Sequence, residues 1–142
     1  MAKGVAAPAR RVIMFVDDQV SLQKQVTAYF WQLGFDVVAV GDGDVALFKL
    51  RERRPDIVCL NLHLPRMSGY EVCEQIRTSP PFDDLPVLMT SERGSLEARA
   101  HCYEAGANGY LGKPYSLARL AAEVRRLLEA EPDDGELSLK LA

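Results

Sequence analysis

Two adjacent carboxylates and one carboxamide are the residues of this chain with the clearest chemical potential. Asp17 and Asp18 follow the apolar run 12–16, and Asn61 follows the apolar run 57–60. Carboxylate oxygens at such a place suit a hard divalent cation such as Mg²⁺. A carboxamide, in contrast, has no anionic oxygen with which to attack phosphorus. The three residues therefore suggest a phosphate-accepting magnesium site that lacks its nucleophile.

The elements that must position these residues are five short apolar runs that alternate with five longer segments of helical spacing. The runs span residues 12–16, 35–40, 57–60, 87–89 and 109–111, and the helical segments span 21–33, 44–53, 70–77, 95–105 and 116–130. This alternation predicts a doubly wound parallel α/β sheet, whose ligands bind beyond the carboxyl ends of the strands. The polar residues at those ends are Asp17, Asp18, Asn61, Thr90, Ser91 and Lys113.

Two helical segments carry more local predictions. Gly34 is placed to end the segment 21–33 in a left-handed conformation. In the segment 44–53 we expect a single buried stripe, made of Val45, Ala46, Phe48, Leu50 and the stem of Lys49.

Composition limits the classes of protein to which this chain can belong. Its 142 residues, 48% of them apolar, suit one domain with one core. Seventeen basic and twenty acidic residues give a net charge of -3, so we expect no direct binding to nucleic acid. The three cysteines are too scattered for a disulfide framework or a zinc site. No run approaches the roughly 20 apolar residues of a membrane span, so we expect a cytoplasmic protein with no membrane contact.

Four motifs are informative when they are taken together. They are Asp17-Asp18, Asn-Leu-His-Leu-Pro-Arg-Met-Ser-Gly at 61–69, Pro-Val-Leu-Met-Thr-Ser at 86–91 and Gly-Tyr-Leu-Gly-Lys-Pro at 109–114. In order and spacing they resemble the receiver domain of bacterial two-component response regulators, of the kind found in chemotaxis regulators. The resemblance covers about residues 11–130. It implies a flavodoxin-like fold with five helices and a five-stranded parallel sheet in the order 2-1-3-4-5.

The resemblance also implies a magnesium and phosphoryl site. In this family an aspartate at the end of the third strand takes a phosphoryl group from a histidine kinase, and the acidic pair holds Mg²⁺. By analogy, Asp18 would bind the metal directly, Asp17 through water, and His63 through its backbone carbonyl. Asn61 stands at the position of the phosphate acceptor, so we expect any magnesium binding to be weak.

The remaining implied roles concern the phosphoryl group and the response to it. Lys113 would contribute a positive charge, aimed by a cis bond to Pro114, and Ser91 a hydroxyl. Tyr110 matches the aromatic residue whose rotamer reports the state of the site. Glu92 then stands where the family keeps a small residue, which disfavours phosphate. In a second register Thr90 is the hydroxyl and Ser91 the small residue, and this objection disappears; we favour the first register.

Several of these residues also have simpler interpretations. Asn61 could be a turn residue whose side chain bonds to the following backbone, and this role is compatible with a lost nucleophile. The His63 ring is more often solvated than catalytic at such a position. Lys113 is expected to form an ion pair with Asp17 or Asp18. The face that such domains often use for partners carries Tyr103, Tyr110, Arg99 and Arg119.

We therefore expect a signalling module that is not an enzyme and acts by binding proteins, without phosphorylation at the usual position. Its partner would be a histidine kinase or a downstream effector, and a homodimer is compatible with the sequence. The alternative is an ordinary phosphorylatable receiver that carries an Asp-to-Asn substitution at Asn61. A phosphatase or nucleotide-binding enzyme is disfavoured, because no glycine-rich phosphate loop follows the first strand. The expected organisation is a flexible segment 1–10, a receiver-like domain 11–130 and an acidic tail or linker stump 131–142.

Overall fold

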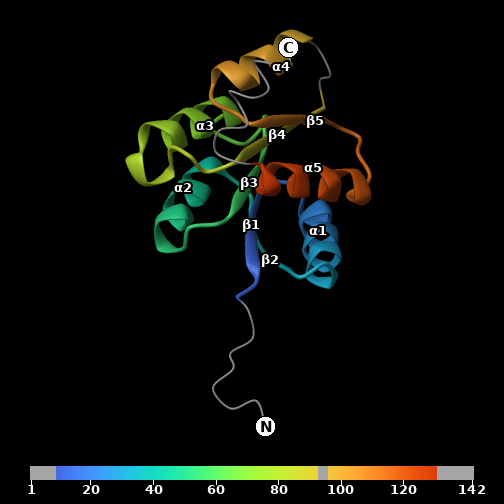
Figure 1. Cartoon of the computed structure of the whole chain (residues 1–142). Coiled ribbons are helices and arrows are strands. Elements are labelled where there is room, and N and C mark those ends of the chain that lie inside the picture. Colours follow the sequence, from blue (N-terminus) through green and yellow to red (C-terminus); the bar gives the residue numbers. More distant parts are fainter. Residues whose placement is uncertain (1–8, 93–95, 131–142) are drawn as a thin grey trace.

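A computed structural model describes residues 9–92 and 96–130, and it contains the parallel α/β sheet that the sequence predicts (Figure 1). The tail 131–142, most of the segment 1–10 and the start of the helical segment 95–105 fall outside the described residues. The strands are β1 (Arg11–Val16), β2 (Phe35–Val40), β3 (Ile57–Asn61), β4 (Val87–Ser91) and β5 (Gly109–Gly112). All neighbouring strands are parallel, in the order β2-β1-β3-β4-β5, which confirms the flavodoxin-like topology.

Five α-helices and one short 3₁₀ helix connect the strands. They are α1 (Val20–Gln32), α2 (Gly43–Glu52), α3 (Gly69–Thr78), the 3₁₀ helix η1 (Pro80–Phe82), α4 (Leu96–Glu104) and α5 (Leu117–Glu129). Side chains begin three of them: Asp42 accepts from Val45 N–H, Ser116 from Arg119 N–H, and Ser68 forms a capping box with Glu71. Gly34 has φ 98° after α1, as expected for a glycine at that position.

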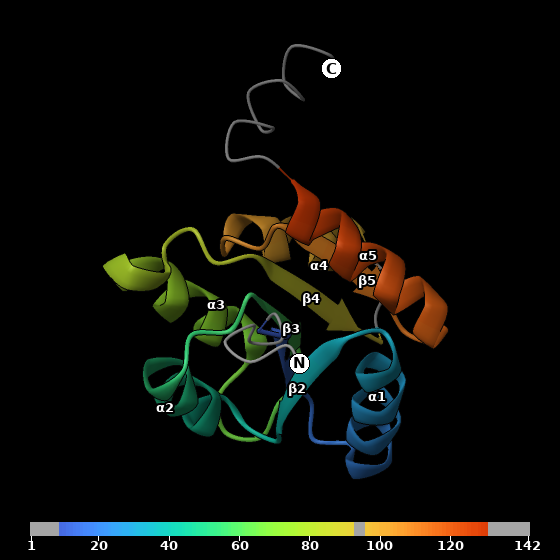
Figure 2. The same ribbon diagram turned by 60° about the horizontal axis from the view of Figure 1, so that its bottom comes forward.

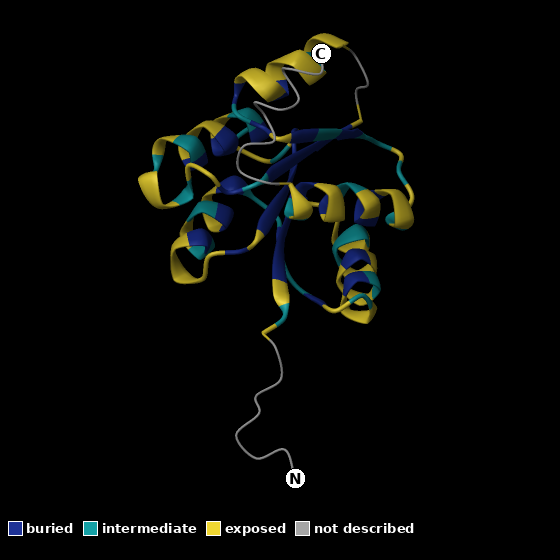
Figure 3. Cartoon of the chain, viewed as in Figure 1, coloured by how far each residue is buried: buried dark blue, intermediate teal, exposed yellow. Residues whose placement is uncertain are grey.

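The helices cover the two faces of the sheet as separate layers (Figure 2). Val26 and Phe30 of α1 and Val124 of α5 pack with Ile13 and Phe15 of β1 on one face. The other face is covered by α2, α3 and α4, through a cluster that includes Ala46, Val72 and Cys102. The inner strands β1, β3 and β4 are almost entirely buried, and the edge strands β2 and β5 are partly buried (Figure 3). The carboxyl ends of the strands are therefore held by packing from both sides.

The buried stripe expected on α2 is partly wrong. Ala46 and Leu50 are buried, but Phe48 is 63% and Val45 39% exposed. At about 100° per helical residue, Val45 and Phe48 are turned roughly 100° and 200° away from Ala46. The sheet therefore covers only the Ala46–Leu50 side of the helix. The three cysteines are all buried and free, and burial raises the pKa of Cys59 to about 12.

None of the helices in the described part of the chain has the length and apolarity that crossing a bilayer requires.

Replacing Gly69 by alanine should destabilise the fold at the edge that carries the polar residues. A Cβ at Gly69 would lie 2.5 Å from the carbonyl oxygen of Asn61 and 2.9 Å from Cα of Leu62, and backbone atoms cannot turn aside as a side chain can. We expect Gly69→Ala to cost roughly 1–3 kcal/mol of unfolding free energy, as overpacking typically does, measured by urea denaturation. Gly112→Ala is the control, because no atom lies within 4 Å of its added Cβ. Equal losses in both variants would contradict the close approach.

Candidate functional site

The polar residues singled out by the sequence gather at one end of the sheet, around a cavity of about 410 Å³. Its walls come from the loops after β1, β3, β4 and β5. They are formed by Asp18, Gln19, Asn61, His63, Glu92 and Lys113. Such a crevice beyond the carboxyl ends of parallel strands is where doubly wound sheets bind ligands.

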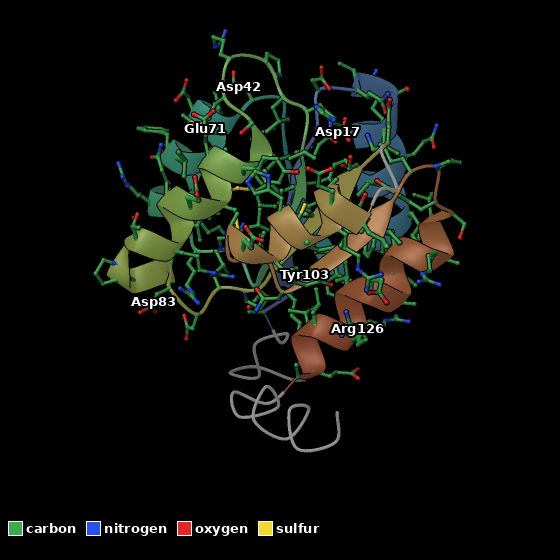
Figure 4. All side chains as sticks on the ribbon, turned by 90° about the horizontal axis from the view of Figure 1, so that it is seen from above. Asp17, Asp42, Glu71, Asp83, Tyr103 and Arg126 are labelled. Carbon is green, nitrogen blue, oxygen red and sulfur yellow. The ribbon has the colours of Figure 1, made fainter. Side chains whose placement is uncertain are left out.

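Asp17 and Lys113 form a buried ion pair at the floor of this region. Lys113 Nζ lies 2.7 Å from Asp17 Oδ2, and the two side chains are only 10% and 1% exposed. Asp17 Oδ1 accepts a further hydrogen bond of 2.9 Å from the backbone N–H of Gln19. Both oxygens of Asp17 therefore have a partner. The peptide bond between Lys113 and Pro114 is cis, as the family resemblance implies. Figure 4 shows Asp17 beside the start of α1.

The carboxamide of Asn61 is turned onto its own loop. Asn61 Nδ2 donates a hydrogen bond of 2.9 Å to the backbone carbonyl of His63, and Asn61 is only 6% exposed. The simpler interpretation of Asn61, a side chain bonded to the following backbone, therefore describes its geometry. The carbonyl that the resemblance assigns to a metal instead accepts an N–H. His63 itself is exposed and belongs to the cavity lining.

The backbone of β4 is hydrogen-bonded to the loop after β3 on one side and to the residue after β5 on the other. The Thr90 carbonyl accepts from Leu62 N–H at 2.8 Å, and the Ser91 carbonyl accepts from Lys113 N–H at 2.7 Å. Alternation along β4 puts Thr90 on the face covered by α1 and α5, and Ser91 on the opposite face, which Tyr110 also shares. Glu92 lines the cavity together with Asn61 and Lys113, whichever of Thr90 and Ser91 supplies the hydroxyl.

A second cavity of about 480 Å³ adjoins the first, because Gln19, Glu92 and Lys113 line both. Its other walls are the more apolar Leu22, Pro114 and Tyr115. The Tyr115 hydroxyl is buried and has no hydrogen-bond partner among the described residues. Burial raises the pKa of Tyr115, and the nearby Cys59 and Asp17 raise it further. This hydroxyl is therefore held neutral beside the ion pair.

The residues expected on the partner-binding face lie on α4, β5 and α5. Tyr103 is 41% exposed, and the Arg99 guanidinium lies 6.0 Å from its ring centroid. Arg119 is exposed near the start of α5, whereas Tyr110 is half-buried against the core. Figure 4 shows Tyr103 on α4 near Arg126 of α5. The sequence therefore places one accessible aromatic and two cations on this surface, with Tyr110 set beneath it.

Three residues of the site escaped the sequence analysis. Gln19 and Tyr115 line the cavities, and Gln23 Nε2 donates a hydrogen bond of 2.6 Å to the carbonyl of Asp17. Two signals were available, because Gln19 directly follows the acidic pair and Tyr115 directly follows Lys113-Pro114. Gln23 had no such signal, because its contact depends on how α1 approaches β1.

Comparison with known proteins gives a consistent result. The family described as response regulator receiver domain matches residues 13–125. The response regulator MprA of Mycolicibacterium vanbaalenii is 39% identical over 124 residues, which make up 87% of this chain and 53% of that protein. The chain thus spans about half the length of this relative.

Solved structures agree in fold. The chemotaxis protein CheY4 of Vibrio cholerae superposes with a TM-score of 0.80 at 28% identity, over 84% of this chain and 99% of that one. The receiver domain of the sensor histidine kinase PA1611 from Pseudomonas aeruginosa gives a TM-score of 0.78 at 28% identity, over 86% of this chain and 100% of that one. That structure has a magnesium ion coordinated in its active-site cleft.

Removing one partner of the buried ion pair should cost more than removing both. In Lys113→Met the Asp17 charge stays buried without its counter-ion, and such losses are about 3–5 kcal/mol. We expect Asp17→Asn/Lys113→Met to recover much of that loss in urea denaturation. Arg66→Met is the control, because Arg66 pairs with Asp42 while 69% exposed, and exposed pairs contribute about 1 kcal/mol or less. Additive effects at Asp17 and Lys113 would contradict the coupling.

Proposed function

Since the chain belongs to the response regulator receiver domain family, we propose that it is a two-component signalling module that acts by binding proteins and is not phosphorylated at position 61. Receiver domains are signalling modules, and the proposed role requires no catalysis by the chain itself. The Asn61 side chain stands where the family resemblance puts the acceptor carboxylate, and a carboxamide lacks a nucleophilic anion.

The observation that carries this proposal is the hydrogen bond from Asn61 Nδ2 to the His63 carbonyl. A carboxylate at this position has no N–H to donate, so it would leave that carbonyl available to a cation. The carboxamide instead satisfies the carbonyl from within the loop. Its geometry therefore supports a loop that is complete without a metal.

The described residues fit Mg²⁺ poorly. Both Asp17 oxygens already accept hydrogen bonds, from Gln19 N–H and from Lys113 Nζ, and the His63 carbonyl accepts from Asn61. Asp18 is the remaining carboxylate of the acidic pair. No group of three or more His, Cys, Asp or Glu side chains suited to a metal occurs among the described residues. Because Mg²⁺ requires near-octahedral oxygen ligands, we propose weak binding at most, in contrast to the PA1611 receiver.

Charge in the cavity argues against phosphate as well. Asp18 and Glu92 line the wall with Lys113, whose ammonium group is already paired with Asp17. A phosphoryl group would meet two carboxylates and one compensated cation, and like charges at close range are unfavourable. Glu92 contributes to this wall whichever residue of Thr90 and Ser91 supplies the hydroxyl.

Protein partners are proposed for the surface formed by α4, β5 and α5. Tyr103 offers an exposed aromatic ring, and Arg99 and Arg119 offer cations that can pair with a partner's carboxylates. A histidine kinase or a downstream effector is the class of partner that the family suggests. Tyr110 lies between this surface and the core, so its rotamer can connect them.

The unchanged protein should gain no phosphoryl mass when incubated with acetyl phosphate and Mg²⁺, because position 61 has no nucleophile. Intact-protein mass spectrometry measures this directly. A phosphorylated species at the residues around Asn61 would overturn the proposal.

Two variants separate the proposal from an ordinary receiver with a single substitution. If Asn61→Asp labels as strongly as Asn61→Asp/Glu92→Ala, the rest of the site is competent and the ordinary receiver is supported. We expect Asn61→Asp to label weakly and Asn61→Asp/Glu92→Ala to label at least tenfold more, because the double variant also removes the opposing carboxylate. His63→Ala is the matched control, since this substitution keeps the backbone carbonyl and should change neither result.

Magnesium affinity should also rise when Asn61 is replaced by aspartate. Asn61→Asp adds a carboxylate ligand and frees the His63 carbonyl, so its Mg²⁺ affinity should exceed that of the unchanged protein by more than tenfold. Isothermal titration calorimetry with MgCl₂ measures both constants. Equal affinities would show that Asn61 does not limit metal binding.

A further inference from the structure

A shallow groove of about 580 Å³ runs along α1 on the side of the edge strand β2. Its walls include Gln23, Lys24, Thr27, Ala28 and Trp31 of α1, with Ala39 of β2. Figure 2 shows β2 at the margin of the sheet with α1 beside it. Val20, which is 60% exposed, extends the line of Lys24, Thr27 and Trp31 at spacings of four, three and four residues. Residues at that spacing form one stripe along a helix.

Trp31 is an exposed aromatic residue that is nevertheless held in place. It is 58% exposed, and the Arg10 guanidinium lies 3.7 Å from its ring centroid. Arg10 is itself fixed by Asp36 at 3.1 Å and by the Trp31 carbonyl at 2.6 Å. A pre-oriented tryptophan loses little rotamer freedom on binding, and tryptophan is prominent among residues that dominate interface energies.

The middle of the groove is lined by small side chains that offer no free hydrogen-bond donor. Thr27 Oγ1 donates to the Gln23 carbonyl at 2.7 Å, so its hydroxyl is satisfied within the helix. Ala28 beside it is small and exposed. Small residues flanked by Val20 and Trp31 allow another helix to approach closely, with its own large side chains on either side of the centre.

Among the described residues that line the groove, Lys24 is the single charged one. No carboxylate among the described residues pairs with it, although the whole chain has a net charge of -3. A partner that places a carboxylate opposite Lys24 would therefore be preferred over one that places a cation there.

The size and charge of the groove disfavour a second copy of this chain as its occupant. Val20 to Trp31 spans about 17 Å of a helix about 10 Å wide, on the order of 200 Å², whereas a stable interface buries about 800 Å² on each partner. An antiparallel pairing of two α1 helices would also bring their Lys24 ammonium groups together. A short helix of another protein avoids the repulsion between two Lys24 side chains, and a small contact area suits a transient signalling contact better than a stable dimer.

We propose that the groove between α1 and β2 is a docking site for an amphipathic helix of another protein, with apolar residues beside Trp31 and Val20 and a carboxylate opposite Lys24. This surface is separate from the α4, β5 and α5 face. It does not depend on the chemistry at position 61.

Trp31 provides the measurement, because it is the single tryptophan of the chain. The probe is a synthetic helical peptide with leucines on one face and flanking glutamates, and its counterpart has lysines in place of the glutamates. We expect the glutamate peptide to shift Trp31 emission to shorter wavelength and to bind at least tenfold more tightly than the lysine peptide. Lys24→Glu should reverse that preference. Arg51→Glu, an equal charge change on α2, should leave it unchanged.

Nuclear magnetic resonance shifts locate the binding site and report on variants without tryptophan. Trp31→Ala should weaken the glutamate peptide at least tenfold, whereas Phe48→Ala, which removes a similarly exposed aromatic on α2, should not. Asn61→Asp should bind the peptide as the unchanged protein does, which separates this test from that of the proposed function. Equal binding of both peptides, shifts centred on α4, or a concentration-dependent dimer that buries Trp31 would each overturn the proposal.

Discussion

The buried ion pair between Lys113 and Asp17 is the interaction on which the site depends. It connects the end of β1 to the end of β5, 96 residues apart in the chain and separated by two strands in the sheet. Charges buried this deeply pay a desolvation cost that their attraction offsets only with good geometry. Here the pair distance is 2.7 Å, and Asp17 gains a backbone donor as well. The cavity above the pair therefore has a fixed floor, and its chemistry is set by the residues around that floor.

Asn61 contributes a neutral hydrogen-bond donor to the site and no carboxylate charge. In a site built around a metal, the oxygens around the cleft repel one another until a cation arrives. Here the Asn61 amide supplies a donor to the His63 carbonyl, and Lys113 is left with Asp17 as its partner. These two contacts satisfy the Asn61 amide nitrogen, the His63 carbonyl and the Lys113 ammonium group, and buried polar groups generally need such partners.

The sequence predicted the sheet well because its strands are apolar runs separated by helices, and parallel strands buried on both faces leave little choice of topology. It also predicted the Lys113 ion pair, whose partners both stand at strand ends. The sequence predictions failed where a side chain's burial or contact depends on how one element packs against another. Phe48 and Val45 look like core residues in α2, yet α2 turns another side to the sheet. Gln23 reaches Asp17 only because α1 lies against β1 at a particular angle.

Helix α1 connects the groove beside β2 with the site that contains the Asp17–Lys113 ion pair. Gln23 lines the groove beside β2, and its amide donates to the Asp17 carbonyl at 2.6 Å. One side chain thus belongs both to the groove and to the framework of the ion pair. An occupant that displaced Gln23 would remove a donor from the main chain of Asp17, and Asp17 orients Lys113. A ligand can shift the balance between the arrangement with the Gln23–Asp17 hydrogen bond and the arrangement without it only if it binds one of them more tightly. For the unphosphorylated receiver that we propose, binding energy at α1 is a physically sufficient source for that shift.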